Sequence, residues 1–536
     1  MWKRNLFFVA VLLGGAMAVR AALFTAPVPA HVANFDPAPF DAEEFQRTVS
    51  QVNAAVDQRI REEDLKPAPR ADERTIARRI ALALTGTIPS LQELREFDAY
   101  TGKHRVPWWV EGRLRDRRSA DYLAERFARA FVGTDAGPFI VFRRRRFVSW
   151  LSDELMANRP YDQVVRELIA GEGLWTDKPA TNFVTVTIEQ GKNNQPNPER
   201  LAGRVARAFL GIRLDCAQCH NHPFADWKQA DFRGLAAFFG QTHQGFTGIY
   251  DGDGELKLEN RKTGVPETIA PRVPFRADLL PQTASLRAAL AGWVTHSHNP
   301  YFARAMANRA WALMFGRPML NQVDDLLSPD EGPRALEVLA EDFTRHHFDL
   351  RRLFHLIAAT EAFQRDSAAD HEITADHEKI WAAFPLTRLR PEQVVGSLEQ
   401  AASLTTLDAD THILIRLATS AAREQFVKRY GDTGEDEFDG RGGTIPQRLL
   451  LMNGDLVLER TKEALFNAAT RIGWQAPDDR AAVRVAYLTV LTREPTPEEA
   501  AHFEQRLRGA TGNERARRME DLYWALINST EFSWNH

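Results

Sequence analysis

The chain has 536 residues, of which 44% are hydrophobic and 26% charged, and its formal net charge is −4. This composition is typical of a globular protein and excludes a disordered chain, and the length is enough for about three domains. The small net charge gives no reason to expect nucleic acid or an anionic membrane as a partner, and two cysteines are too few for a disulfide-based scaffold.

The first residues have the pattern of a secretory signal peptide. Lys3 and Arg4 precede an uncharged run of 14 residues, 6–19, which is shorter than the roughly 20 residues of a membrane-spanning helix. Small residues around Ala21 offer a cleavage site, although Arg20 beside it leaves an uncleaved N-terminal anchor as the alternative. We expect residues 1–21 to be removed and the mature chain to be periplasmic or secreted, touching a membrane only if that anchor stays.

Helical patterns follow a linker. Residues 22–44 are rich in Ala, Pro and Phe, and apolar residues then recur at three- and four-residue spacing through residues 45–240. The segment "DERTIARRIALALTG" ends on Gly86, which suits a helix C-cap. The next segment, "SLQELREFDAY", begins with Ser90 and has Glu93 three residues later, which is a capping-box pattern.

The helical pattern is interrupted once. Residues 241–284 are rich in Gly, Pro and Thr, and "GIYDGDGELKLENRKTG" predicts a short β-hairpin. Helical periodicity returns over residues 285–536. The sequence therefore predicts a mainly α fold with two helical domains, separated by a Gly/Pro-rich segment that holds most of the β-structure.

The only two cysteines of the chain lie together in "GIRLDCAQCHNHPFADW". Cys216 and Cys219 are followed directly by His220, which is the spacing of a c-type haem site: two thioether anchors and the proximal iron ligand. The same residues could form a redox or structural dithiol. They could also bind zinc together with His222.

Haem is the preferred interpretation among these three. The thiols are three residues apart, about one helical turn, as thioether attachment requires, and export agrees with haem attachment outside the cytoplasm. A dithiol enzyme would have a βαβ context that the sequence lacks. Adjacent ligands at Cys219 and His220 strain a zinc tetrahedron, although His243 or His298 could complete such a site from afar.

The second face of a haem iron needs its own ligand or stays open. By residue type the candidates are Met452 in "LLLMNGDL", Met306, His222 and His243. Core packing is the ordinary role of a buried methionine. Because His222 is two residues from His220, it cannot easily reach the opposite face of the iron.

Other charged motifs have structural interpretations. The basic run "FRRRRF" at residues 142–147 favours a solvated helix face or an acidic partner over nucleic acid. Asp324 and Asp325 offer a carboxylate pair, but adjacent side chains on a helix point apart, so we expect a cap or a salt bridge. The sequence contains no G-x-S-x-G, P-loop or H-E-x-x-H motif, so no enzyme class is predicted.

Several long segments resemble a known pair of domains. "FLGIRLDCAQCHNHPFADWKQADFRGLAAFFGQT" and "LALTGTIPS" resemble a planctomycete-type domain of unknown function, 1549, described as cytochrome-like. "RLRPEQVV", "LLLMNGDLV" and "DLYWALINSTEFSWNH" are similar to its usual companion, domain of unknown function 1553. The resemblance covers roughly residues 45–240 and 285–536. It implies export but no established activity.

One position departs from the family pattern. The family usually has an aspartate after C-A-Q-C-H and then H-P-F-D, whereas this chain has Asn221 and places Asp226 one residue later. A charge that could orient an imidazole is thus moved or lost.

Together these patterns predict an exported c-type haem protein that transfers electrons through its CxxCH site, with a redox partner protein. The alternative is an exported accessory protein that binds a partner or polysaccharide, in which the Cys/His loop is a structural disulfide or a metal site.

Export can be tested directly. Cell fractionation should find the protein outside the cytoplasm, and N-terminal sequencing should begin near Ala22, because the signal peptidase cleaves after a short apolar run. A cytoplasmic pool that retains Met1 would contradict this prediction.

Overall fold

The structure is a computed structural model that describes residues 35–134, 144–188, 194–221, 227–259, 264–320, 322–326, 332–407, 425–431, 438, 444–464 and 467–536, with the backbone alone at Asp215 and Cys216. Helices dominate this part of the chain, which confirms the predicted mainly α fold.

The first helical region precedes the hairpins. It contains α2 (Ala38–Asp41), α3 (Glu43–Glu62), α4 (Glu73–Thr85), α5 (Leu91–Ala99), α6 (Arg105–Leu114), α7 (Arg117–Val132), α8 (Arg144–Met156), α9 (Tyr161–Ala170), α10 (Asn182–Thr185), α11 (Pro198–Val205) and α12 (Gln229–Ala237). Short 3-10 helices lie at Pro179–Thr181 and Asp215–Gln218, and a π-helical turn lies at Ala206–Leu210.

The second helical region follows them. It contains α13 (Leu286–Val294), α14 (Phe302–Phe315), α15 (Arg334–Arg345), α16 (Leu350–Ala359), α17 (Glu361–Gln364), α18 (Ala375–Lys379), α19 (Pro391–Ala401), α21 (Ile445–Asn453), α22 (Asp455–Thr461), α23 (Ala468–Gln475), α24 (Asp479–Leu491), α25 (Pro497–Leu507), α26 (Gly512–Ile527) and α27 (Thr530–Ser533). A 3-10 helix at Ala277–Leu279 precedes them.

Two predicted helix ends are confirmed. Gly86 follows α4 with φ of +68°, a left-handed conformation that favours glycine. The Ser90 side chain accepts from the Glu93 amide at 3.0 Å, and the Glu93 carboxylate accepts from the Ser90 amide at 2.8 Å. This reciprocal pair is the capping box expected at the start of α5.

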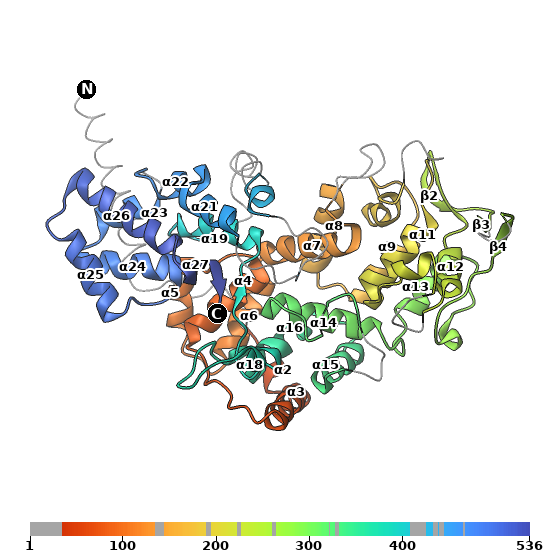
Figure 1. Cartoon of the computed structure of the whole chain (residues 1–536), viewed down its shortest axis with the longest axis horizontal. Coiled ribbons are helices and arrows are strands. Elements are labelled where there is room, and N and C mark those ends of the chain that lie inside the picture. Colours follow the sequence, from red (N-terminus) through yellow and green to blue (C-terminus); the bar gives the residue numbers. More distant parts are fainter. Residues whose placement is uncertain are drawn as a thin grey trace.

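The interrupting segment forms two antiparallel hairpins, where the sequence predicted one. β1 (Thr242–Gly245) pairs with β2 (Gly248–Asp251), and β3 (Leu256–Glu259) pairs with β4 (Pro266–Ile269). One further pair joins distant parts of the chain: β5 (Thr387–Arg388) lies antiparallel to β6 (Trp534–Asn535). The hairpins and the helices α11 to α13 occupy one end of the elongated molecule (Figure 1).

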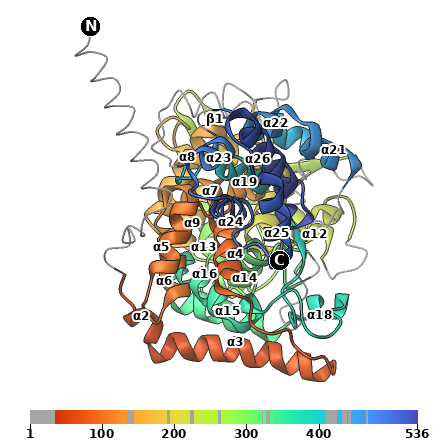
Figure 2. The same ribbon diagram turned by 90° about the vertical axis from the view of Figure 1, so that its left-hand side faces the viewer.

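The hydrophobic core continues across the hairpin segment. One buried cluster runs in sequence from Phe40 to Phe384 and includes side chains from both helical regions. Helix α14 is buried along its whole length and packs against α4, α15, α16 and the π-helical turn. On the far side of α15 lies α3, which forms the lower edge of Figure 2. The two regions are therefore separate in sequence but share one core.

A second core lies at the other end of the molecule. It is built by α19 and α21 to α27 and takes in Leu82, Ile88 and Leu91 from the first region. Gln393 donates to the Leu82 carbonyl at 2.9 Å, and Thr87 donates to the Gly396 carbonyl at 3.0 Å. These bonds dock α19 on the end of α4.

No helix within the described ranges is both long and apolar enough to cross a membrane.

An ion pair at this junction should control stability. Burial raises the pKa of Glu392, but Arg126 on α7, with Arg129 and Arg390 nearby, outweighs it and holds that pKa at about 2. Glu392→Gln breaks the buried ion pair with Arg126, so we expect a loss of about 3 kcal/mol at pH 7.

The loss of stability in Glu392→Gln should become smaller in acid. Because the folded pKa lies below the value of about 4.3 in the unfolded chain, the pair stabilises fully above that value and progressively less as the pH falls toward 2. Urea unfolding of the wild type and of Glu392→Gln at pH 7 and pH 3.5 measures this difference. The exposed Glu514→Gln is the control, and an equal effect of Glu392→Gln at both pH values would contradict the assignment.

Candidate functional site

The approach to the cysteines is fixed by close backbone packing. Helix α11 continues into the π-helical turn at Ala206–Leu210, an irregularity that is frequent at functional sites. Gly211 ends it with φ of +63°, and its carbonyl accepts from the Leu326 amide at 2.7 Å. A Cβ at this position would lie 2.9 Å from Leu326 Cγ, so both the conformation and the space require glycine.

A buried carboxylate holds the next residues. Arg213 donates from Nε and Nη2 to Asp324 Oδ1, at 3.0 and 2.8 Å, and Arg207 Nε lies 3.7 Å from Asp324 Oδ2. Asp324 is 7% exposed. The salt bridge expected for this aspartate is confirmed, and it anchors the chain two residues before the cysteine loop.

The loop that carries the CxxCH residues lies on the surface. The 3-10 turn Asp215–Gln218 buries Ala217, while Cys219, His220 and Asn221 are exposed. The backbone of Cys216 lies in this turn, and its side chain is outside the part of the chain that the structure describes. Cys219 and His220 thus lie at the surface of the protein.

Gln229, at the start of α12, closes the loop. Its side-chain Nε2 donates to the carbonyls of Gln218 and Cys219, at 3.2 and 3.0 Å. Its backbone amide donates to Asn221 Oδ1 at 3.0 Å. Asn221 is the residue at which this chain departs from the aspartate of the family pattern. Gln229 could not be predicted as part of the site, because it lies ten residues after Cys219 and belongs to no motif.

The ring of His220 has a defined tautomer. Its Nδ1 lies 2.7 Å from the Asn221 carbonyl, and because a carbonyl oxygen only accepts, Nδ1 carries the proton of this bond. Nε2 is therefore the nitrogen with a lone pair, on an exposed side chain. This is how a metal-binding histidine is commonly oriented, by a bond from Nδ1 to a backbone carbonyl.

The candidates for a second iron ligand lie in different surroundings. Met306 is buried in α14, and Met452 is partly buried in α21. Helix α21 and the loop before α12 lie toward opposite ends of the long axis in Figure 1, so the structure does not bring Met452 and the cysteine loop together.

The histidine candidates contact their own neighbours. His243 Nε2 lies 3.2 Å from the Asp253 carbonyl, and the exposed His298 lies beside His296, with ring centroids 5.4 Å apart. His222 falls outside the described residues. Over the ranges that are described, no three His, Cys, Asp or Glu side chains come together as a metal site. The zinc alternative stays open, because it needs His222 and the Cys216 thiol.

Two family models match the chain. PSCyt2, described as a protein of unknown function (DUF1549), matches residues 51–244, and PSD1, described as a protein of unknown function (DUF1553), matches residues 286–507. The two matched regions lie on either side of the hairpins. Neither the curated proteins nor the solved structures contain a match to this chain.

The role of Gln229 is testable by hydrogen exchange. Gln229→Ala removes the side-chain bonds to Gln218 and Cys219, so backbone amides of residues 214–221 should exchange severalfold faster through local opening. Arg233→Ala, on the same helix, is the matched control and should leave their exchange unchanged. Equal exchange in both variants would show that the loop is held by other contacts.

Proposed function

Because the chain belongs to the planctomycete-type cytochrome-like family, with a PSCyt2 domain followed by a PSD1 domain, we propose that it is an exported c-type haem protein that transfers electrons. Cys216 and Cys219 would hold the porphyrin through thioether bonds, and His220 would bind the iron. A haem in this position supplies a one-electron couple. The electron would pass to or from a redox partner protein.

The observation that carries the proposal is the state of His220. The bond from Nδ1 to the Asn221 carbonyl leaves the Nε2 lone pair available, as iron ligation requires, and the ring is exposed. Cys219 beside it is also exposed, so attachment machinery could reach its sulfur without unfolding the core. The residues that are described at this site therefore fit a covalently attached haem.

The neighbouring contacts would support such a site mechanically. Gln229 joins the loop to α12, and the Arg213–Asp324 salt bridge joins the preceding segment to the second helical region. A redox site benefits from this rigidity, since an electron carrier should change its geometry little between its two charge states. The surface position of the loop would allow a partner protein to approach closely.

Haem attachment has a direct test. The mature protein, made in cells with cytochrome c maturation, should be red, show a Soret band, keep its haem in denaturant and carry the added mass of one haem. Cys216→Ser with Cys219→Ser should abolish all four properties. His220→Ala should impair attachment and change the spectrum, because the proximal nitrogen is lost.

A matched control is available in the second helical region. His298→Ala removes an exposed histidine and should leave the added mass of haem and the optical spectrum unchanged. An intact Cys216–Cys219 disulfide, or a zinc ion bound at the loop, in protein made with the attachment machinery present would overturn the proposal and favour a structural or metal site.

A further inference from the structure

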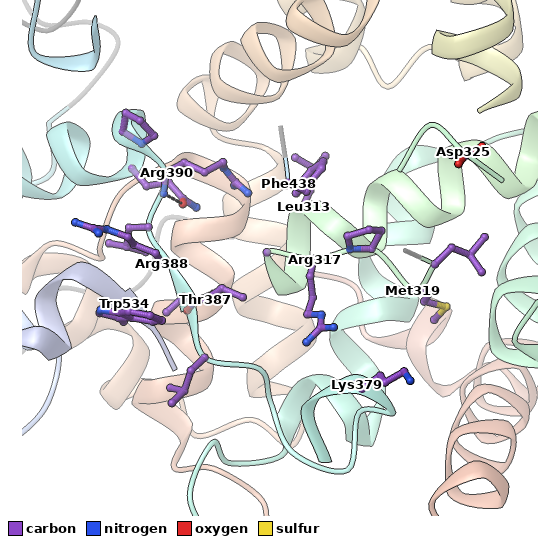
Figure 3. Close-up of a pocket in the computed structure, with 18 of the residues that line it drawn as sticks. Leu313, Arg317, Met319, Asp325, Lys379, Thr387, Arg388, Arg390, Phe438 and Trp534 are labelled. Carbon is purple, nitrogen blue, oxygen red and sulfur yellow. Dashed lines mark hydrogen bonds between the residues drawn. The ribbon is translucent and has the colours of Figure 1, made fainter. Parts of the chain in front are cut away.

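A cavity of about 1170 Å³ lies outside the cysteine loop. It lies between the C-terminal ends of α3 and α14, the segment 386–391 that contains β5, and the start of α21. Trp534 and Asn535 of β6 complete its wall. Figure 3 shows Arg388 and Trp534 on one side, Arg317 near the middle, and Lys379 and Met319 on the other side.

The lining of this cavity is strongly basic. Among the described residues that line it, seven are arginine or lysine, and two, Glu62 and Asp325, are acidic. This surplus of five positive charges occurs in a chain whose formal net charge is −4. The helix ends at the cavity add little to this positive charge. Helices α15, α19 and α21 begin there, whereas α3 and α14 end there. Each start contributes about half a positive charge and each end about half a negative charge, so these contributions largely cancel.

The arginines on one wall are held by neutral groups. Arg388 donates to the hydroxyl of Tyr430 at 3.0 Å, and Arg390 donates to the hydroxyl of Tyr122 at 2.6 Å. A tyrosine hydroxyl positions a guanidinium without cancelling its charge, unlike a carboxylate. The Nε groups of Arg388 and Arg390 have no acceptor among the described residues. These Nε groups are buried, but both arginines line the cavity, and the Glu392 carboxylate near Arg390 offsets part of its charge.

The charges on the remaining walls are only partly compensated. Arg317 lies 3.9 Å from Glu378, beyond hydrogen-bond distance, and the exposed Lys379 makes no ion pair within the described ranges. Arg334 is paired with Glu341 at 2.9 Å. Several cations on separate walls therefore face one space, and a single small anion could not contact all of them.

Aromatic and amide groups accompany the cations. Trp534 is partly exposed in the wall, and the Arg390 guanidinium lies 5.8 Å from the centroid of the Phe438 ring. Asn535 is 6% exposed, and its Oδ1 accepts no hydrogen bond from the described residues. An indole face suits the apolar face of a sugar ring, and an amide oxygen suits a hydroxyl donor.

We propose that this cavity binds an acidic oligosaccharide, in which several sugar rings carry carboxylate or sulfate groups. Spaced anionic groups would meet the cations of the separate walls, and Arg388 and Arg390 offer the planar donor geometry that both anions accept. The sugar rings and hydroxyls would meet Trp534 and Asn535. The volume exceeds the range of about 300–1,000 Å³ that is usual for drug-sized ligands, which favours several sugar units over one.

Calorimetric titration of the full mature chain tests this proposal. The probes are a sulfated hexasaccharide and hexagalacturonate, with an uncharged glucose hexasaccharide, inorganic sulfate and ATP as comparisons. At least one acidic hexasaccharide should bind, and the one that binds more tightly identifies the anionic group. The uncharged sugar and inorganic sulfate should not bind measurably, and added salt should weaken the complex.

Substitutions of charged cavity residues test whether the oligosaccharide binds in this cavity. Arg317→Gln with Lys379→Gln removes two solvent-accessible charges and should weaken binding about tenfold or more. Arg317→Lys with Lys379→Arg keeps the charges and should retain binding, which separates charge from a folding defect. Arg145→Gln with Arg480→Gln, two exposed arginines away from the cavity, is the matched control.

Three results would overturn the proposal: no binding of any acidic hexasaccharide, unchanged binding by Arg317→Gln with Lys379→Gln, or tighter binding of ATP than of both acidic sugars. The titration can be repeated on Cys216→Ser with Cys219→Ser. Its outcome is therefore independent of whether the cysteine loop carries haem.

Discussion

The architecture depends on α4, which is buried from Ile76 to Thr85 without interruption. Ile76, Ala77 and Ile80 belong to the first core, and Leu82 belongs to the second. Two of its arginines, Arg78 and Arg79, are also buried, and Arg78 donates to the Val490 carbonyl at 3.2 Å.

Arg79 extends the reach of α4 to segments that are remote in sequence. It donates to the carbonyls of Phe363, Arg365 and His536. Arg79 Nη2 has no acceptor among the described residues, so the other donors of this buried guanidinium depend on these three acceptors together. Helix α4 is thus the common support on which both cores and the C-terminal strand are assembled, and its residues are constrained on every side.

Features that depend on neighbours in sequence could be predicted, and features that depend on distant segments could not. The C-cap at Gly86 and the capping box of Ser90 and Glu93 are local, so their patterns were sufficient. The position of the β-structure around residues 242–269 was predicted as well, but its pairing into two hairpins was not. The CxxCH motif was evident from spacing, but the exposure of its loop and the contacts of Gln229 depend on how α12 packs.

The basic cavity shows the same limit more strongly. Its lining comes from segments that begin near residue 55 and end at residue 535, and no single segment looks like a binding motif. Arg388 and Arg390 lie in "RLRPEQVV", which contributed only to the family resemblance. That Tyr122 and Tyr430 would hold these arginines follows from tertiary packing alone.

One short segment connects the two sites. Asp324 binds Arg213 and Leu326 donates to Gly211, so these residues support the approach to the cysteine loop. Asp325, between them, lines the basic cavity. Asp324 and the backbone amide of Leu326 therefore contact the approach to the cysteine loop, while Asp325 between them lines the cavity.

The pairing of β5 with β6 has a consequence for biosynthesis. Thr387 and Asn535 are partners in this ladder although about 150 residues separate them, and Arg388 and Trp534, their neighbours, line the cavity. Residues 387–390 are synthesised long before residues 534–536, so this strand pair and the acceptor that His536 offers to Arg79 can form only once residues 534–536 have been made. Until then the buried guanidinium of Arg79 on α4 lacks one of its three backbone acceptors. This late step therefore forms polar contacts of Arg79 and the cavity wall together with the burial of Phe532 in the second core.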